Sequence, residues 1–450
     1  MKFFSAAVGV SLWTGNAIHK AMQNARTKRE IREIYQHAAN ANFHNRSVAA
    51  LSNINKQQLL LISGDPSDND IIDVTSDSTT PAIDYIWGDD KNLEGAVVSG
   101  GQSDARVRAL MPFVRKSQIK GIPLIALHNG NRDLELMIAA NSRDYELISQ
   151  GKFYYDVFRG MPVDDIATLM YETMPEDSAN PGAEALLHAL LEVVLRKNGT
   201  VTFNNLAAFP LVDLKDTLDE MSKAGEVTAQ EYREISHYYM AGSSELHTVR
   251  IFLNKLNRQA ESIYGRPTSN ACNIKKMMNN KGVVAMDVGN SNNNLLFFLV
   301  INHLKILQQR YNFSILLDDI AISRFPKVSD LLRCRTYAIS HNDFLASLYG
   351  GEVRGEDLFS EITGNVSTIV LLRHSSGTSC QKWSEHLGKY HKIKILYNIS
   401  QNKAFLNSSE SRGISVDETD EPRVRAETIG KLPDTLACIH TKEGTLFATI

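Results

Sequence analysis

The chain has 450 residues, of which 43% are hydrophobic, and its formal net charge at pH 7 is −3. This is enough apolar material for roughly two or three packed domains. The near-neutral charge excludes the overall basic field that nucleic-acid-binding proteins usually carry. The four cysteines are scattered without a CxxC pair, which favours reduced structural thiols in the cytoplasm over a disulfide framework.

The N-terminal segment is expected to be helical. Residues Phe3 to Trp13 are apolar, but a membrane-spanning helix needs about 20 apolar residues, so no transmembrane helix is predicted here. A helix docked on the protein is the simpler prediction, and an amphipathic helix resting on a membrane or partner is the alternative. The predicted location is therefore cytoplasmic, with peripheral attachment at the inner face of the cell membrane as the alternative.

Short apolar runs bounded by turn residues recur along the chain, and helical patterns lie between several of them. Runs of this length that are apolar on both faces are typical of buried parallel strands. The alternation predicts an α/β fold with a mostly parallel sheet and crossover helices. The runs are Leu59–Ile62, Ala96–Val98, Ile122–Leu127, Val283–Met286, Ser314–Leu317, Thr368–Leu372 and Ile393–Tyr397.

The middle of the chain is different, because helical patterns follow one another there. Ala183 to Leu195 is a strong helical pattern, and beyond Val201–Phe203 no segment suggests a strand. This predicts an all-α insertion that splits the α/β domain. Asn407 to Arg423 is polar and is predicted to be an exposed connection before a final hairpin, Leu436 to Ile450. The predicted division is 1–50, 51–165, 166–265 and 266–450.

Residues Val97 to Phe113 are arranged as a strand, a glycine-containing loop and the start of a helix. A working phosphate loop holds phosphates with backbone N–H groups, a lysine and a hydroxyl on Mg²⁺. Where that motif needs Gly-Lys-Ser/Thr, this chain has Asp-Ala-Arg. An ordinary strand-to-helix turn is the alternative. The candidate nucleotide-binding positions are Gly100, Gly101, Gln102, Ser103, Asp104, Ala105 and Arg106.

A second nucleotide signature is the apolar run that ends in Asp318 and Asp319. In a Walker B strand the first carboxylate holds Mg²⁺ and the second polarises the attacking water. Both aspartates are therefore candidate catalytic residues, and Asp318 is the candidate Mg²⁺ ligand. Asp319 is one methylene shorter than the usual glutamate. A carboxylate pair that caps the next element is the alternative.

The order of these segments resembles the TraG/TraD-like type IV coupling proteins. These are hexameric ATPases of RecA-like fold that recruit DNA or protein substrates to conjugative and type IV secretion channels. The resemblance runs from about Leu59 to Gly444. It is carried by Val97–Pro112, Ile166–Tyr264, Ser314–Pro326, Phe344–Gly350 and Gly364–Leu372.

The departures from the family pattern bear on activity. The resemblance places the loop lysine on Ala105, the Mg²⁺-binding hydroxyl on Arg106, the catalytic glutamate on Asp319 and the sensor glutamine on Ser340. Loss of the lysine alone removes several kcal/mol of stabilisation, a rate loss of roughly 10³-fold or more. We therefore expect a fold that has lost hydrolysis and has no resident cofactor. ATP and Mg²⁺ are expected only if the degenerate loop still binds nucleotide.

The resemblance implies a catalytically degenerate component of a conjugation or type IV secretion system. Such a protein would recruit substrate, through the helical insertion, or scaffold the complex. The implied partners are machinery proteins, a protein or DNA substrate, and an oligomer of this chain alone or with an intact ATPase. An active hexameric ATPase with an atypical loop is one alternative, and a nucleic-acid-binding module of a mobile element is another. Nucleotide binding separates the first two, and steeply salt-dependent duplex binding would favour the third.

Overall fold

A computed structural model describes most of the chain, and the described residues fall into two compact units. The larger unit comprises Leu93–Val97 and Leu110–Val366, and the smaller comprises Met1–Asn92, Val98–Ala109 and Ser367–Ile450. The strand β1 (Ala96–Ser99) and the helix α4 (Ser103–Ile119) belong in part to each. The residues described are 32–38, 41, 94–149, 157–264, 274–289, 294–324, 332, 336–349, 355–404, 407–441 and 444–450.

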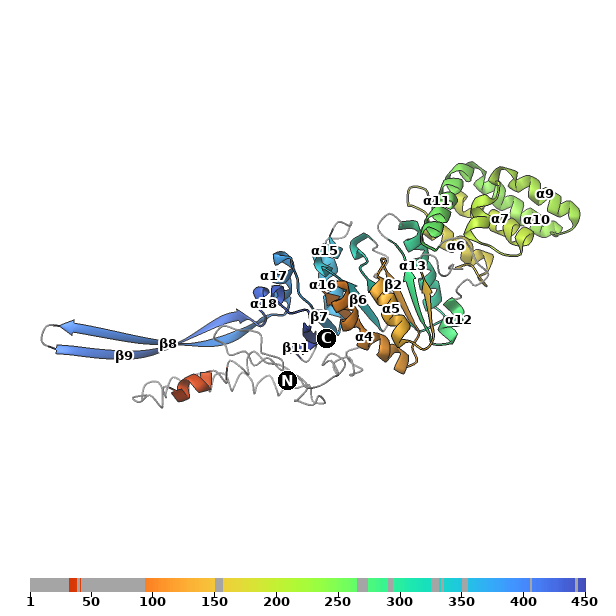
Figure 1. Ribbon diagram of the computed structural model, residues 1–450. Helices are drawn as coiled ribbons and strands as arrows, with labels where there is room; N and C mark the ends of the chain where they lie inside the picture. The colour runs from red at the N-terminus through yellow and green to blue at the C-terminus, as the bar shows by residue number, and fades with distance from the viewer. Residues whose placement is uncertain are drawn as a thin grey trace, which may run out of the picture. The chain divides into compact units, whose positions relative to one another are not determined.

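The larger unit is built on a parallel sheet (Figure 1). Its strands, in spatial order, are β1, β6 (Tyr337–His341), β5 (Ser314–Asp318), β2 (Leu124–His128), β4 (Val283–Asp287) and β3 (Tyr145–Ile148). The pairs β6–β5, β5–β2, β2–β4 and β4–β3 are all parallel. Every residue of β2 and β5 is buried, which explains why both strands are continuous apolar runs in the sequence. The expected α/β fold is confirmed.

Helices connect these strands, as parallel pairing requires. The helix α5 begins after Asn131, whose side-chain oxygen accepts the Leu134 N–H and so satisfies one of the free donors of the first turn. The connecting helices are α4, α5 (Arg132–Asn141), α12 (Ile274–Asn279), α13 (Asn294–Gln308), the 3₁₀ turn Ile322–Arg324, α15 (Phe344–Leu348) and α16 (Gly355–Asn365).

The larger unit also contains a run of helices without a described strand between Val163 and Tyr264 (Figure 1). The suggestion of a strand at Val201–Phe203 is wrong, because the Thr202 hydroxyl caps α8 by accepting the Asn205 N–H. The helices are α6 (Val163–Thr173), α7 (Pro181–Asn198), α8 (Phe203–Ala208), α9 (Leu214–Ala224), α10 (Ala229–Gly242) and α11 (Leu246–Tyr264), with 3₁₀ turns at Leu211–Asp213 and Ser243–Glu245.

Two of these helices, α7 and α10, approach each other closely at Gly242. A Cβ atom on this residue would lie 2.6 Å from the backbone N of Leu186 and would also meet the carbonyl oxygen of Gly182. A glycine is needed at this position because only a hydrogen atom fits between the two backbones.

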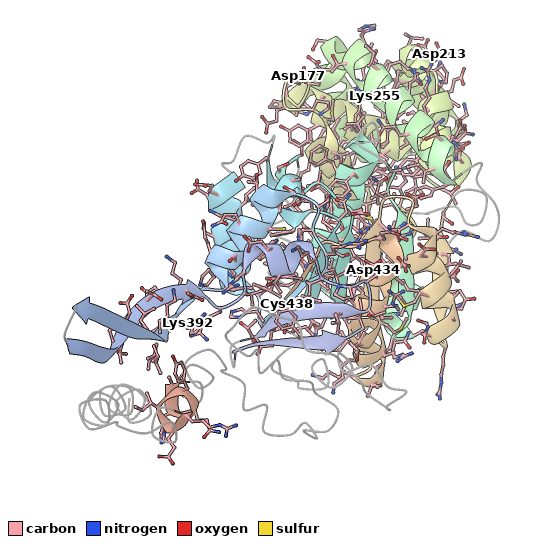
Figure 2. The ribbon with its side chains drawn as sticks, turned by 60° about the vertical axis from the view of Figure 1, so that its left-hand side comes forward. Asp177, Asp213, Lys255, Lys392, Asp434 and Cys438 are labelled. Carbon is pink, nitrogen blue, oxygen red and sulfur yellow. The ribbon has the colours of Figure 1, made fainter. Side chains whose placement is uncertain are left out.

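The smaller unit places β7 (Thr368–Leu371) between β1 and the C-terminal hairpin. The spatial order is β11 (Gly444–Thr449), β10 (Leu436–Thr441), β7 and β1, and β10 runs antiparallel to both of its neighbours. The expected final hairpin is thus confirmed. Cys438 on β10 is a buried free thiol, and burial raises its pKa to about 12 (Figure 2). The helices α17 (Gly377–His386) and α18 (Ala426–Gly430) also belong to this unit.

Two predictions for the C-terminal region are wrong. Residues Ile393–Tyr397 are not a buried parallel strand, and Asn407–Arg423, expected to be an exposed connection, is almost entirely a strand, although its described side chains at residues 415–422 are exposed or half-buried. They belong to a long antiparallel hairpin of β8 (Lys389–Ala404) and β9 (Asn407–Pro422), which forms a separate two-stranded sheet. The sequence signal was present: Ile393 and Ile395 alternate with lysines, which is the period of a strand with one polar face.

Some predictions lie outside the described residues. These include the apolar N-terminal run, the strand at Leu59–Ile62 and the hairpin turn at residues 442–443. Residues 32–38 form a helical stretch. Among the described residues, none of the helices combines the length and the apolar character that a membrane crossing requires.

Candidate functional site

The turn after β1 is shorter than a phosphate loop needs. The strand ends at Ser99 and α4 begins at Ser103, so three residues connect them. Gly100 and Gly101 have φ angles of +93° and +69°, a region that side-chain-bearing residues rarely adopt. A Cβ atom on Gly100 would lie 2.7 Å from both the His374 ring and the Leu372 carbonyl oxygen. The glycines are therefore explained by close contact with the chain that follows β7.

The polar backbone groups of this turn are bonded within the smaller unit. The Gly101 N–H donates to the Arg373 carbonyl oxygen at 2.7 Å. The Gly101 carbonyl oxygen accepts from Arg106 Nη1 at 3.0 Å, and Arg106 is only 2% exposed. A phosphate cradle needs such N–H groups to face the ligand, so the Gly101 N–H is already committed elsewhere.

His374, which follows β7, contacts this turn and was not among the residues that the sequence assigned to the candidate site. Its Nε2 lies 2.8 Å from Ser99 Oγ and its Nδ1 lies 2.8 Å from the Leu372 carbonyl oxygen. Because a carbonyl oxygen only accepts, Nδ1 carries the proton and Nε2 accepts from the Ser99 hydroxyl. The imidazole is 3% exposed, and its two hydrogen bonds link the end of β1 to the chain that follows β7. These two residues are 275 positions apart, so no local pattern could have revealed the contact.

The other loop candidates lie at the start of α4. Ala105 is buried, whereas Gln102 and Asp104 are exposed and Ser103 is half-buried. Asp104 Oδ2 accepts from Arg108 Nη1 at 2.8 Å, and this hydrogen bond holds the pKa of the Asp104 carboxyl below its usual value. The repulsion that Asp104 would exert on a phosphate is offset in part by this arginine.

The second group of candidates lies in the larger unit, at the carboxyl ends of β5 and β6. Asp318 is paired in register with Ser340, and both residues are buried. Asp319 adopts a left-handed φ of +52°, and its N–H donates to the Ser340 carbonyl oxygen at 2.8 Å. Its Oδ1 accepts the Asn342 N–H at 3.1 Å. Asp319 therefore stabilises the turn after β6 and, in the described contacts, does not cap the next element along the chain.

Asp318 has a partner that the sequence did not identify. Its Oδ2 accepts from Asn131 Nδ2 at 2.5 Å, across 187 positions of sequence. The same asparagine caps α5 and donates its N–H to His128 Nδ1 at 3.1 Å. The carboxylate of the candidate Mg²⁺ ligand is therefore held by an amide donor from the end of β2.

A row of polar residues crosses this edge of the sheet. His128 on β2 pairs in register with Asp287 on one side and with Asp318 on the other. His128 Nε2 lies 3.6 Å from Glu135 Oε1, and burial lowers the pKa of His128 against the attraction of the neighbouring carboxylates. In the sequence, three of these strands show the same pattern: each is an apolar run that ends in a polar residue, His128, Asp287 or Asp318. We call His128, Asn131, Glu135, Asp287 and Asp318 the edge cluster.

The edge cluster is not arranged as a metal centre. Asp287 Oδ1 accepts the Gly130 and Gly289 N–H groups, at 3.1 and 2.8 Å, and Glu135 accepts from Arg132 at 2.5 Å. Within the part of the chain that the structure describes, no three His, Cys, Asp or Glu side chains are placed to hold a metal ion together. The loop candidates and the edge cluster belong to different units.

No protein-family model and no curated protein sequence matches this chain. Solved structures of the bacterial conjugative coupling protein TrwB do match. TrwB bound to a non-hydrolysable GTP analogue gives a TM-score of 0.52 at 14% identity, covering 80% of this chain and 86% of TrwB. The chain has the fold of a conjugative coupling protein.

Two further TrwB structures agree. TrwB with ADP and Mg²⁺ gives a TM-score of 0.50 at 14% identity, over 79% of this chain and 84% of TrwB. The unbound form gives 0.51 at 14% identity, over 80% and 85%. At this identity the likeness to TrwB establishes the fold, which confirms the resemblance expected from the order of the motifs.

Proposed function

We propose that this chain is a component of conjugation or type IV secretion machinery that keeps the coupling-protein fold without nucleotide hydrolysis. The observation that carries the proposal is Ala105, 2% exposed, at the position that the resemblance assigns to the loop lysine. A methyl group there supplies no charge to the β and γ phosphates. Since that cation stabilises the transition state directly, its loss removes most of the expected rate.

The contacts of the loop support the same proposal. The Gly101 N–H is bonded to Arg373, and Asp318 Oδ2 is bonded to the Asn131 amide. An ionised carboxylate has two oxygens and about four lone-pair sites, so this bond uses only part of the acceptor capacity of Asp318. We do not propose ATP and Mg²⁺ as resident cofactors, because Ala105 supplies no charge to the phosphates.

The test is calorimetric titration of the full chain with ATP and Mg²⁺, together with an assay of phosphate release. We expect neither binding nor release. Micromolar, Mg²⁺-dependent binding with steady release that is lost in Asp318→Asn would overturn the proposal. Asp213→Asn, in the 3₁₀ turn before α9, is the matched control for a carboxylate outside the candidate site.

An active ATPase with an atypical loop remains the second candidate, and Arg106 favours it. Its guanidinium already lies at the loop, 3.0 Å from the Gly101 carbonyl oxygen. If Arg106 replaces the lysine, Arg106→Lys should keep part of the phosphate release and Arg106→Met should abolish it, whereas Arg108→Met should change little. Absence of release in the unaltered chain excludes this candidate.

We further propose that the helices between Val163 and Tyr264 receive the substrate or an adaptor. A hollow of about 500 Å³ lies between α7 and α9, lined by Arg196, Lys197, Thr217, Glu220, Met221 and Ala224 among others. Its mixture of charges and apolar atoms suits a peptide segment. Ala224→Arg would fill the hollow and should reduce substrate transfer in the host cell, whereas Gln230→Arg on α10 serves as the control.

The remaining expectations stay proposals. These are the machinery partners, an oligomer with an intact ATPase, and a peripheral position at the inner face of the membrane, which depends on residues outside the described part of the chain. The sequence also has a basic patch, Arg324, Lys327, Arg333 and Arg335, for which contacts with phosphates are the sharper interpretation and a solvated face the simpler one; this patch lies largely outside the described residues. The nucleic-acid-binding alternative therefore gains no support from the fold.

A further inference from the structure

We propose that the hollow between α7 and α9 binds a basic segment of polypeptide, with a lysine or arginine side chain of that segment seated in it. The inference rests on the proposed function of these helices as the receptor for a substrate or an adaptor, and it names the chemistry of what they receive. A polypeptide, and not DNA, is the ligand of this site. The supporting observations are the lining of the hollow, the contacts of its charged groups and the net charge of the surrounding helices.

The hollow lies where two helices end. Arg196 and Lys197 belong to the last turn of α7, and Met221 and Ala224 belong to the last turn of α9. Figure 1 shows α7, α9 and α10 packed together in this part of the larger unit. The carbonyl groups at the carboxyl end of a helix carry a partial negative charge. Two such ends therefore favour a cation over an anion in the hollow.

Part of the lining is apolar. Met221 is 5% exposed, and it lines the hollow together with Ala224 and Thr217. The volume of about 500 Å³ lies within the range of sites that bury small ligands, about 300–1,000 Å³. Lysine and arginine lay their alkyl stems on such a surface and keep the charged head at its rim. A basic side chain therefore matches both parts of the lining.

The two cations of the lining already have partners. Arg196 donates from Nη1 to Glu192, and its Nη2 lies 3.1 Å from Glu231 Oε1. The Lys197 ammonium lies 5.7 Å from the centroid of the Phe209 ring, which is a cation–π contact. An anionic ligand would have to compete with these contacts, so the two cations do not make the hollow an anion site.

Glu231 holds its negative charge beside Arg196. In the capping box of α10 it accepts the Thr228 N–H at 2.7 Å, and this bond, together with the Arg196 guanidinium, lowers the pKa of Glu231 to about 2. Arg196 thus faces two carboxylates, those of Glu192 and Glu231, and its single charge is already neutralised.

The two carboxylates of the lining are available to a ligand. Glu220 on α9 and Glu226, two residues beyond the end of that helix, are both exposed. Within the part of the chain that the structure describes, neither carboxylate accepts a hydrogen bond or forms an ion pair. A lysine or arginine head at the rim can donate charge-assisted hydrogen bonds to them.

The surrounding helices have the same preference for a cation. Residues 163–264 contain 16 Asp and Glu but only 8 Lys and Arg, a net charge of −8, whereas the whole chain has a net charge of −3. The rest of the chain is therefore net positive. Figure 2 labels two of the exposed carboxylates of this region, Asp177 and Asp213. A negative field attracts a basic polypeptide and repels the phosphate backbone of DNA.

The experiment is a fluorescence anisotropy titration of the full chain with three short labelled peptides. In the first peptide arginine alternates with alanine, and in the other two glutamine or glutamate replaces each arginine. We expect the arginine peptide to bind about tenfold or more tightly than either of the others, since tenfold corresponds to about 1.4 kcal/mol and each exposed ion pair contributes up to about 1 kcal/mol. Its binding should weaken as salt rises, because exposed charges are screened.

Three double variants locate the binding. Glu220→Gln with Glu226→Gln should weaken binding of the arginine peptide about tenfold. Glu176→Gln with Asp177→Asn removes the same charge at the opposite end of α7, whose 18 residues span about 27 Å, and should leave the affinity nearly unchanged. Glu220→Lys with Glu226→Lys should bind the glutamate peptide in place of the arginine peptide, a gain that a misfolded chain would not show.

Several results would overturn the inference. These are no binding of the arginine peptide, equal binding of the three peptides, an unchanged affinity in the variant with glutamine at positions 220 and 226, and displacement of the arginine peptide by duplex DNA. Failure of the receptor function would be seen separately, as normal substrate transfer by Ala224→Arg in the host cell. The peptide titration measures the charge preference of the hollow, whereas the transfer assay measures whether the hollow is used.

Discussion

Asn131 Nδ2 donates to the fully buried carboxylate of Asp318 at 2.5 Å. A buried charge is tolerated only when it is paired or hydrogen-bonded, and this amide provides such a bond from the end of β2. The interaction joins the turn after β2 to the end of the neighbouring parallel strand β5. It is therefore a structural bond of the sheet edge.

Asn131→Asp tests this bond. It keeps an oxygen acceptor for the α5 cap but replaces the donor with a second carboxylate beside Asp318. Because hydrogen bonds to charged groups contribute about 1.5–3 kcal/mol to stability, we expect the free energy of unfolding to fall by about 2 kcal/mol. The exchanged pair, Asn131→Asp with Asp318→Asn, restores one amide and one carboxylate and should recover much of the loss. Urea unfolding measures the stability of the unaltered chain, the single variant and the exchanged pair. Equal stabilities for the three proteins would contradict the hydrogen bond between Asn131 and Asp318.

Gly100→Ala tests the close approach of the β1 turn to His374. The new Cβ would meet the imidazole ring at 2.7 Å, in addition to the cost of a left-handed φ. The matched control is Gly388→Ala in the same unit, with a φ of +83° and no atom within 4 Å of its Cβ position. We expect the control to lose about 1–2 kcal/mol of stability from backbone strain alone, and Gly100→Ala to lose more. If thermal unfolding shows similar losses of stability for the two variants, the space beside His374 accommodates a Cβ atom at position 100.

Gly242→Ala tests the contact between α7 and α10. The substitution improves helix propensity by up to about 1 kcal/mol, but the new methyl group would meet the backbone of Leu186 at 2.6 Å. We expect net destabilisation of roughly 1–3 kcal/mol from overpacking. Gly364→Ala in α16 has open space around its Cβ position and should stabilise the protein. The two variants should therefore shift the melting temperature in opposite directions.

His303 on α13 should make stability depend on pH. Burial, assisted by Lys275, lowers the pKa of His303 to about 3, whereas an unfolded histidine has a pKa of about 6.5. Between these values the unfolded chain binds the extra proton, so stability falls as pH decreases from about 6.5 toward about 3. His303→Gln removes the titrating imidazole, so the free energy of unfolding should depend less on pH in this variant. His247→Gln, exposed on α11, should keep the slope of the unaltered chain in urea unfolding at several pH values.

Much of the central sheet could be predicted from the sequence. The strands β2 and β5 are buried on both faces, so residues 124–127 and 315–317 form uninterrupted apolar runs that are visible in a local window. The strands β3 and β6 were not predicted, because Tyr145–Ile148 and Tyr337–His341 are short and mix polar with apolar residues. The hairpin was missed for a related reason: the β9 sequence is polar, and its strand conformation depends on pairing with β8.

The candidate site, like the sheet, could be predicted from the sequence only in part. The sequence by itself determined that the loop lacks a lysine, that two adjacent aspartates stand at the carboxyl end of β5 and that glycines precede α4, because residue type is a local property. Only the tertiary structure decided that His374 fills the space behind Gly100 and that Asn131 holds Asp318. Those partners lie 274 and 187 positions away, and the packing of the sheet brings them together. Long-range packing sets which atom satisfies a buried polar group, and no local pattern carries that information.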